Sequence, residues 1–544
     1  MIKTSLRRVP VLLSAVVFCF SFAAFGQGVP KIKSITADQS FYSVLGPDHI
    51  HPINSYGGLA TTSDEHSTIF PPGTLPFQSN YLFLVAARTS LAPEASGLVL
   101  LTNISMPDHN GQWTMDFAPF YGLFAPQNLA GQRNAAVFVT AMSHLNCPPS
   151  TGNDWPDATF DLNYAAPASA FVDPTNPFDQ GGGNLVLVYE GTHRCIGLSG
   201  ASNAGNNFFS TIGVATSKDF GYTWPTYRAN FTPLPGINPT TGPNAPLGAW
   251  GNQVCWGNFC PSINLLQPPA QYGRYAISGP VETIADAFTD STTIAANGLA
   301  GNAGDSEPAA FVDDVHGSWP PYVYVVHTYN PGPFSADSPL YQNFSNVGFD
   351  LSVSRFALNG GTARMQATHW FGKKFLEAGL PGPSGGGHQD PIFPSLHESD
   401  YQNCLAPSQT RSAASISYSD STHEYVLFFV CLSPTEPAPG STYVSGDTKG
   451  GAWFYSTIDA DLYDLSSEDQ WSLPTEVVNS WSPFIPNGGC GKDFNGWYPS
   501  LMSLGARPGH LGTSGFIFYM DGCTDKETTG GRIYSSRAFT IQAQ

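Results

Sequence analysis

The chain has 544 residues, of which 13% are aromatic and only 12% carry a charge, and it contains 56 glycines and 46 prolines. This composition is typical of a loop-rich globular protein with a large core, and it excludes a disordered chain. The formal charge of −19, without any basic stripe, excludes nucleic acid and anionic lipid as expected partners.

The first 26 residues have the pattern of a signal peptide. Three cations within the first eight residues precede an apolar run over 9–25, and small residues end the segment at Gly26. Cleavage near Gly26 removes those three cations and no acids, which takes the formal charge to −22. No later apolar run reaches the roughly 18 residues of a membrane-spanning helix. We therefore expect a secreted or periplasmic monomer without a membrane span.

Short runs of β-branched and aromatic residues, bounded by glycine, proline, asparagine and aspartate, predict strands along most of the chain. The clearest of these runs are 81–87, 184–189, 322–327, 425–430 and 515–519. Four of them are preceded by a strand rich in small residues: 167–173, 307–313, 411–417 and 498–503. A third strand follows each of these four pairs: 210–216, 349–355, 451–457 and 532–537.

This three-strand cycle is an internal repeat. Its small-residue strands begin at 307, 411 and 498, so successive cycles are 104 and 87 residues apart. A repeated all-β unit predicts a propeller, and small residues suit innermost strands, which crowd around the axis. We predict an all-β fold for residues 27–544: a single β-propeller of four-stranded blades with long loops.

The number of blades is five or six. Residues 55–125 are expected to form a first blade ahead of the four clear cycles. The interval between 167 and 307 is long enough to contain a sixth blade around 273–287.

Residues 217–224 read Ser-Lys-Asp-Phe-Gly-Tyr-Thr-Trp and follow a predicted strand. Asp219 can accept hydrogen bonds from turn amides, Gly221 permits a positive φ, and Trp224 can pack on the neighbouring strand. With Ser217 they form the pattern S-x-D-x-G-x-T-W, which resembles the Asp box of sialidases and related bacterial-neuraminidase-repeat propellers. In that family the Asp box joins the third and fourth strands of a blade, away from the active site. The resemblance implies a carbohydrate-active propeller whose partner is a glycan or polysaccharide.

The residues that open the innermost strands are expected to face the central funnel of a propeller. They are Pro167, Glu307, Arg411 and Tyr498. The resemblance to sialidases implies that Tyr498 is the nucleophile, Glu307 the base that takes its proton, and Arg411 a ligand of the substrate carboxylate. A neutral phenol is not repelled by an anionic sugar, and the planar fork of arginine fits a carboxylate. Glu307 and Arg411 could instead pair with each other and close the channel.

Three further residues complete the predicted site. Arg194 and Arg532 are additional candidates for binding the substrate, and Asp48 lies early in the chain, where the family keeps its general acid. On this basis we predict a sialidase-like exo-glycosidase that hydrolyses terminal sugars of glycans.

Two other functions fit the same fold. A five-bladed glycosidase similar to arabinanases would use carboxylates in the funnel, with Asp48, Asp173 and Glu307 as candidates. A non-catalytic propeller would recognise a glycan or a protein instead. No G-x-S-x-G elbow, phosphate-binding loop or dinucleotide fingerprint occurs, which excludes serine-hydrolase, nucleotide-hydrolase and NAD chemistry.

Eight of the nine cysteines follow the leader, an even number that indicates disulfides in an oxidising compartment. The sequence does not determine their connectivity, and pairing of neighbours is the simplest hypothesis: Cys147 with Cys195, Cys255 with Cys260, Cys404 with Cys431, and Cys490 with Cys523. We predict that no cofactor is required and assign no metal ligands to the site. Aspartate-rich turns such as Asp313-Asp314 could bind a structural calcium ion.

Overall fold

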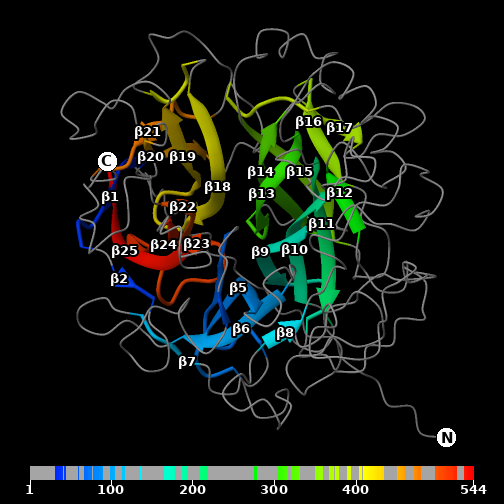
Figure 1. Ribbon diagram of the computed structural model, residues 1–544. Helices are drawn as coiled ribbons and strands as arrows, with labels where there is room; N and C mark the ends of the chain where they lie inside the picture. The colour runs from blue at the N-terminus through cyan, green and yellow to red at the C-terminus, as the bar shows by residue number, and fades with distance from the viewer. Residues whose placement is uncertain are drawn as a thin grey trace, which may run out of the picture.

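The structure is a computed structural model, shown in Figure 1, and every regular element in the part that it describes is a strand. The described residues are 31–40, 42–44, 59–60, 66–75, 78–89, 98–104, 113–116, 135–137, 164–177, 185–193, 209–217, 275–278, 303–315, 320–330, 350–358, 367–372, 374–378, 389–393, 403–406, 409–433, 450–459, 471–478, 496–522 and 532–544. The signal peptide predicted for residues 1–26 lies outside them.

Four hydrogen-bonded sheets form a β-propeller-like ring in the described part of the chain (Figure 1). The first contains β3 (Leu59–Ala60), β4 (Thr68–Phe70), β5 (Tyr81–Thr89), β6 (Leu98–Ile104), β7 (Met115–Asp116) and β8 (Ala135–Val137). The second contains β9 (Tyr164–Val172), β10 (Leu185–His193), β11 (Phe209–Ser217), β12 (Tyr275–Ser278), β13 (Ala303–Val312), β14 (Tyr322–Asn330), β15 (Asp350–Ala357), β16 (Thr368–Phe371) and β17 (Lys374–Ala378).

The other two sheets come from the C-terminal part of the chain and its first strands. The third contains β18 (Thr410–Ser419), β19 (Glu424–Ser433), β20 (Gly450–Asp459), β21 (Thr475–Glu476) and β23 (His510–Leu511). The fourth contains β1 (Ile32–Ala37), β2 (Tyr42–Ser43), β22 (Trp497–Met502), β24 (Ser514–Gly522) and β25 (Arg532–Ala543). The three-strand cycles predicted from the sequence are confirmed, because each predicted run lies within or overlaps one of these strands.

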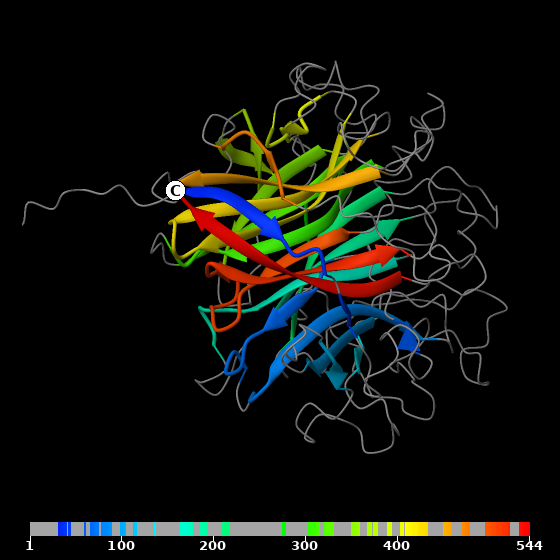
Figure 2. The same ribbon diagram turned by 90° about the vertical axis from the view of Figure 1, so that its left-hand side faces the viewer.

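The first and the last described strands pair with each other in the fourth sheet. β1 pairs antiparallel with β25, from Ile32 opposite Ala543 to Ala37 opposite Phe539. Figure 2 shows the two strands side by side at the C-terminus. An N-terminal strand therefore completes the last blade, which closes the ring by hydrogen bonds and covers a sheet edge.

The nine-stranded sheet contains two antiparallel meanders, β9 to β12 and β13 to β17. A short parallel pairing joins them, with Phe209 opposite Ala303 and Ser210 opposite Gly304. Within the described residues there are thus five meanders in four sheets. The segment around 275–278, considered above for a sixth blade, instead pairs with β11 as the outer strand of the first of these meanders.

The core lies between neighbouring sheets, and β19 shows how the sequence builds it. Its odd-numbered residues Tyr425, Leu427 and Phe429 pack towards β13 to β16. Its even-numbered residues, Val426 and Phe428 among them, pack towards β24, β25 and β1. A continuous apolar run in a strand is explained by burial of both of its faces.

The disulfide between Cys404 and Cys431 is present, with 6.1 Å between the two Cα atoms, which confirms this predicted pair. The other six predicted cysteines lie outside the described residues. Among the described residues, no helix has the length and hydropathy to cross a bilayer.

Candidate functional site at the propeller axis

The innermost strands share one irregularity. In β13, β18 and β22, two residues lie opposite a single residue of the neighbouring strand, which forms a bulge. The first residue of each bulge is Glu307, Ala413 and Tyr498, with φ of 54°, 51° and 53°. A positive φ is uncommon for residues with side chains and marks sites where the surrounding structure holds the backbone in place. The repeated bulge puts Glu307 and Tyr498 at equivalent positions in two blades.

Arg411 does not share that position. It lies two residues before the bulge of β18, where Ala413 is the equivalent residue, so the alignment of Arg411 with Glu307 and Tyr498 is wrong. The bulge inserts a residue into each strand, and sequence composition does not locate such an insertion.

Glu307 is a half-buried carboxylate that joins two blades. Its Oε2 accepts hydrogen bonds from the hydroxyls of Thr328 and Ser412 and from the backbone N–H of Ala413 at 2.9 Å. Within the described residues, each of these bonds ends on the same oxygen. The carboxylate is thus held in one orientation by donors from its own blade and the next one.

A second carboxylate lies beside the backbone of Glu307. Glu190, buried on β10, accepts a hydrogen bond from the Glu307 N–H at 3.1 Å and from the hydroxyl of Ser210 at 2.8 Å. Burial raises the pKa of Glu307, and the negative charge of Glu190 raises it further, while the bonds from Ser412, Thr328 and Ala413 act against this shift. The net result is a pKa above that of an ordinary carboxyl group, which favours the protonated form.

Tyr498 is half-buried at the equivalent bulge of β22. Its ring makes an edge contact with His66, with 5.8 Å between centroids, and lies 6.1 Å from the ring of Trp497. His66 is buried, and its Nδ1 lies 3.4 Å from the hydroxyl of Ser500. Burial lowers the pKa of His66 to about 3, so the imidazole is neutral at pH 7. The aromatic rings of Trp497 and Tyr498 thus belong to the same end of the innermost strands as the Glu307 carboxyl group.

Arg411 is fully buried and makes a two-pronged ion pair with Asp350. Its Nε and Nη2 donate to the two carboxylate oxygens at 2.8 and 2.7 Å, and its Nη1 donates to the carbonyl of Cys404 at 2.6 Å. The guanidinium pairs with Asp350 rather than with Glu307, contrary to the expectation of a Glu307–Arg411 pair. Binding of a substrate carboxylate by Arg411 stays a prediction, and it would require this pair to open.

The remaining predicted site residues are placed only in part. Asp48 and Arg194 lie outside the described residues, as do Asp219, Gly221 and Trp224 of the Asp box. Arg532 begins β25 opposite Gly522, and its side chain is not described. Ser217 ends β11 opposite Leu185, which puts the Asp-box segment directly after the third strand of a meander. The roles of these residues stay predictions.

Asp173 and Glu307 lie at opposite ends of their respective innermost strands, β9 and β13. Asp173 follows β9, and its Oδ1 accepts hydrogen bonds from the backbone N–H and the hydroxyl of Thr175 at 2.8 and 2.6 Å. Glu307 lies before the cavity-lining part of β13, whereas Asp173 lies after that of β9. The structure thus does not bring together this pair of carboxylates.

A cavity of about 260 Å³ runs along the axis from the Tyr498 end. Its walls come from five segments: 66–69, 169–172, 309–312, 415–417 and 500–503. At the Tyr498 end His66 and Ser500 line it, and at the other end Asp314, Arg507 and His510 do.

His510 lies 3.0 Å from Asp314 and 2.8 Å from Asp420, and Arg507 donates to Asp314 at 2.6 Å. The Asp314 carboxylate, a candidate calcium ligand in the sequence, is thus already paired with two basic side chains.

We expect this His510 cluster to make stability depend on pH. Burial lowers the pKa of His510, but its bonds to Asp314 and Asp420 outweigh burial and the charge of Arg507, and the pKa is raised overall. A raised pKa contributes stability below the unfolded value of about 6.5, and this contribution is lost as pH rises through the folded value. The loss should be about 1 kcal/mol or less, because both carboxylates are more than a third exposed.

The measurement is urea unfolding of the parent and of His510→Gln between pH 6 and pH 9. The parent should lose stability across this range, and the variant should show a flatter profile. Equal slopes for the two proteins would remove His510 as the cause.

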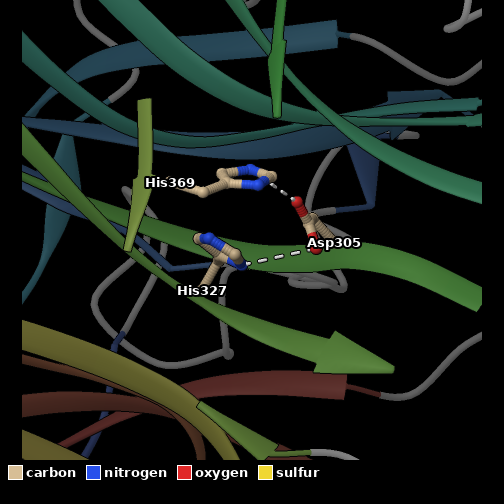
Figure 3. A group of neighbouring side chains, drawn as sticks. All are labelled: Asp305, His327 and His369. Carbon is tan, nitrogen blue, oxygen red and sulfur yellow. Dashed lines mark ion pairs between the residues drawn. The ribbon is translucent and has the colours of Figure 1, made fainter. Parts of the chain in front are cut away.

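A buried cluster that sequence reasoning missed lies on the face of β13 to β16 that packs towards β10 and β11. Asp305, His327 and His369 point towards one another there (Figure 3), and all three are fully buried. One carboxylate oxygen of Asp305 lies 3.7 Å from Nδ1 of His327, and the other lies 3.7 Å from Nε2 of His369. Burial lowers the pKa of His327 to about 3, so this ring is neutral. The sequence signal for this cluster is His327, a histidine inside the apolar run 322–327, but the pairing of the strands decides which residues lie beside it.

Comparison with known proteins leaves the chain without an assigned family. No protein-family profile matches it, and no curated protein matches it. Solved structures similar to it include an N-acetylgalactosamine deacetylase from F. plautii in complex with blood group B trisaccharide (10% identity, 93% of this chain and 95% of that chain covered, TM-score 0.38). Others are an α-L-arabinofuranosidase from Lactobacillus brevis (9%, 94% and 92%, TM-score 0.35) and a levansucrase variant from B. megaterium (11%, 95% and 92%, TM-score 0.41). Because these TM-scores are below 0.5, the arrangement described above rests on the strand pairing of this chain.

Proposed function

We propose that this protein is a carbohydrate-active propeller, a glycoside hydrolase that uses Glu307 as a catalytic carboxyl group at the axis. The observation that carries the proposal is the half-buried Glu307 carboxylate, held through one oxygen at a positive-φ bulge, two residues before the part of β13 that lines the axial cavity. A carboxyl group held in one orientation is what proton transfer to or from a glycosidic oxygen needs.

The aromatic side of the site supports a sugar as the ligand. Trp497 and Tyr498 are half-buried neighbours, Tyr498 contacts the buried His66, and amphipathic rings of this kind suit the mixed surface of a sugar. The Asp-box pattern at 217–224 adds support, because it resembles a motif of carbohydrate-active propellers. More specifically, we propose that the protein hydrolyses terminal sugars with Tyr498 as the nucleophile, as sialidases do.

The test is hydrolysis of a panel of aryl glycosides that includes a sialoside, by the parent and by Glu307→Gln. We expect the variant to lose about 100-fold or more in kcat on whichever glycoside is cleaved, because the amide cannot transfer a proton. Its carbonyl oxygen can still accept from Thr328, Ser412 and Ala413, so the fold should persist. Glu476→Gln, on the outer strand β21, is the matched control and should keep full activity.

The Tyr498→Phe variant distinguishes a sialidase-like mechanism, in which Tyr498 is the nucleophile, from hydrolysis that does not use Tyr498. Loss of sialoside hydrolysis in this variant, with normal rates in Tyr322→Phe, supports a phenol nucleophile. Cleavage of neutral glycosides that depends on Glu307 but not on Tyr498 supports carboxylate chemistry instead. A parent protein that hydrolyses no member of the panel, or a fully active Glu307→Gln variant, contradicts the proposal.

A further inference from the structure

The buried cluster of Asp305, His327 and His369 has the composition of a metal site. Two imidazoles and one carboxylate are ligands that divalent first-row transition metals accept, Zn²⁺ among them. One ligand atom from each residue can be chosen so that all of these atoms lie within 4.8 Å of one another. Each residue comes from a different strand, β13, β14 and β16, so the convergence is a property of the folded sheet.

The spacing within the cluster is too long for hydrogen bonds. Both nitrogen-to-oxygen distances are 3.7 Å, beyond the 2.7–3.2 Å of an N–H···O bond. Two ligands of a tetrahedral ion with bonds of about 2.1 Å lie about 3.4 Å apart, which is close to the distances seen here. The side chains are therefore arranged around a point between them rather than bonded directly to one another.

His327 leaves a polar atom unsatisfied at that point. Its Nε2 lies 3.1 Å from the hydroxyl of Ser354, whereas its Nδ1 is buried without a hydrogen-bond partner in the described part of the chain. If Nε2 carries the proton, the lone pair of Nδ1 faces the carboxylate of Asp305, and two electron-rich atoms meet. If Nδ1 carries the proton, it has no acceptor within hydrogen-bond distance. A cation bound to Nδ1 and Asp305 removes the conflict in the first case.

Neighbouring side chains orient two of the three residues, His327 and Asp305, as outer partners of metal ligands do. The hydroxyl of Ser354 lies 3.1 Å from Nε2 of His327, the ring nitrogen that does not face Asp305, and the Nε2 of Gln389 donates to Asp305 Oδ1 at 2.5 Å. Such second partners set the tautomer of a ligating histidine and the direction of a ligating carboxylate. The Oε1 of Gln389 is a further buried atom without a partner among the described residues.

We propose that Asp305, His327 and His369 bind one divalent transition-metal ion of the Zn²⁺ class, which cross-links strands β13, β14 and β16. All three residues have no exposed surface, so the ion is structural and does not contact a ligand in the axial cavity. It fixes the start of β13, close to the parallel pairing that joins the two meanders of the nine-stranded sheet. The site is independent of the proposed hydrolase activity.

The test is the metal content of protein purified without a histidine tag, after unfolding, refolding with excess Zn²⁺ and gel filtration. We expect about one zinc per chain by mass spectrometry of the digested sample, and less than about a tenth of that for His369→Gln and Asp305→Asn. His423→Gln, which alters an exposed histidine, is the matched control and should keep the full content.

A second measurement covers variants that fail to fold. Zn²⁺ added during refolding of the parent should raise its thermal unfolding midpoint, and refolding with a chelator should lower it, since an ion that binds only the folded state stabilises it. Co²⁺ in place of Zn²⁺ should give the visible absorption of a low-symmetry nitrogen and oxygen site. A parent that refolds without metal, with an unchanged midpoint, overturns the proposal, and so do cluster variants that keep their zinc.

Discussion

Replacing Arg411 by methionine should lower the free energy of unfolding by about 3–5 kcal/mol, because it leaves the carboxylate of Asp350 buried without its partner. Arg411 has no exposed surface, and it makes two hydrogen bonds to Asp350 and one to the carbonyl of Cys404. The measurement is unfolding in guanidinium chloride, followed by tryptophan fluorescence.

Two further variants make this prediction specific. Arg411→Met combined with Asp350→Leu should recover much of the lost stability, because the unpaired charge is then removed as well. Lys31→Met is the control: its ion pair with Asp459 is also short, at 2.6 Å, but both side chains are more than a third exposed, so the loss should be at most about 1 kcal/mol. A loss below 1 kcal/mol in Arg411→Met would contradict a structural role. Such a result, together with a raised KM for an anionic glycoside, would favour the substrate-binding role expected from the sequence.

Removing the disulfide by Cys404→Ala with Cys431→Ala should cost about 3–4 kcal/mol. The bridge closes a segment in which the cysteines are 27 positions apart, and it restricts the unfolded chain accordingly. Both cysteines are buried in the core between β13 to β16 and β18 to β20, and the carbonyl of Cys404 also accepts from Arg411. The midpoint of guanidinium unfolding should therefore fall clearly.

A reductant provides the internal control for this prediction. It should lower the midpoint of the parent by at least as much as the double substitution does. If the reductant lowers the unfolding midpoint of the double variant still further, that fall measures the contribution of the other predicted disulfides. An unchanged midpoint in the double variant under oxidising conditions would show that this bridge does not constrain the unfolded state.

Strand positions were predictable because they follow from local composition. The apolar run 425–430 became β19, since a strand buried on both faces is apolar throughout. The small-residue run 411–417 became β18 beside it. The pairing of β1 with β25 was not predicted, because it joins residues at opposite ends of the chain. The place of 275–278 was open for the same reason: a short strand does not indicate which edge it will join.

The candidate site was predictable only at Glu307 and Tyr498. Both open small-residue strands in the sequence, and both lie at the first position of an equivalent bulge, in β13 and in β22. Arg411 opens a strand of the same kind, but the register of that strand turns its guanidinium into the blade and onto Asp350. Glu190 was missed as a neighbour of Glu307, since 117 positions separate the two residues.

Composition and periodicity by themselves determined that this chain forms repeated three-strand units with small residues on the inside, because β-strand formation and burial depend on neighbours two residues apart. Only the tertiary structure decided which polar groups meet. Asp305, His327 and His369 are far apart in sequence, and the pairing of β14 with β15 and of β15 with β16 brings them within reach of one ion. Hydrogen-bond register across strands sets such contacts, and register depends on bulges and on long-range pairing that no local pattern encodes.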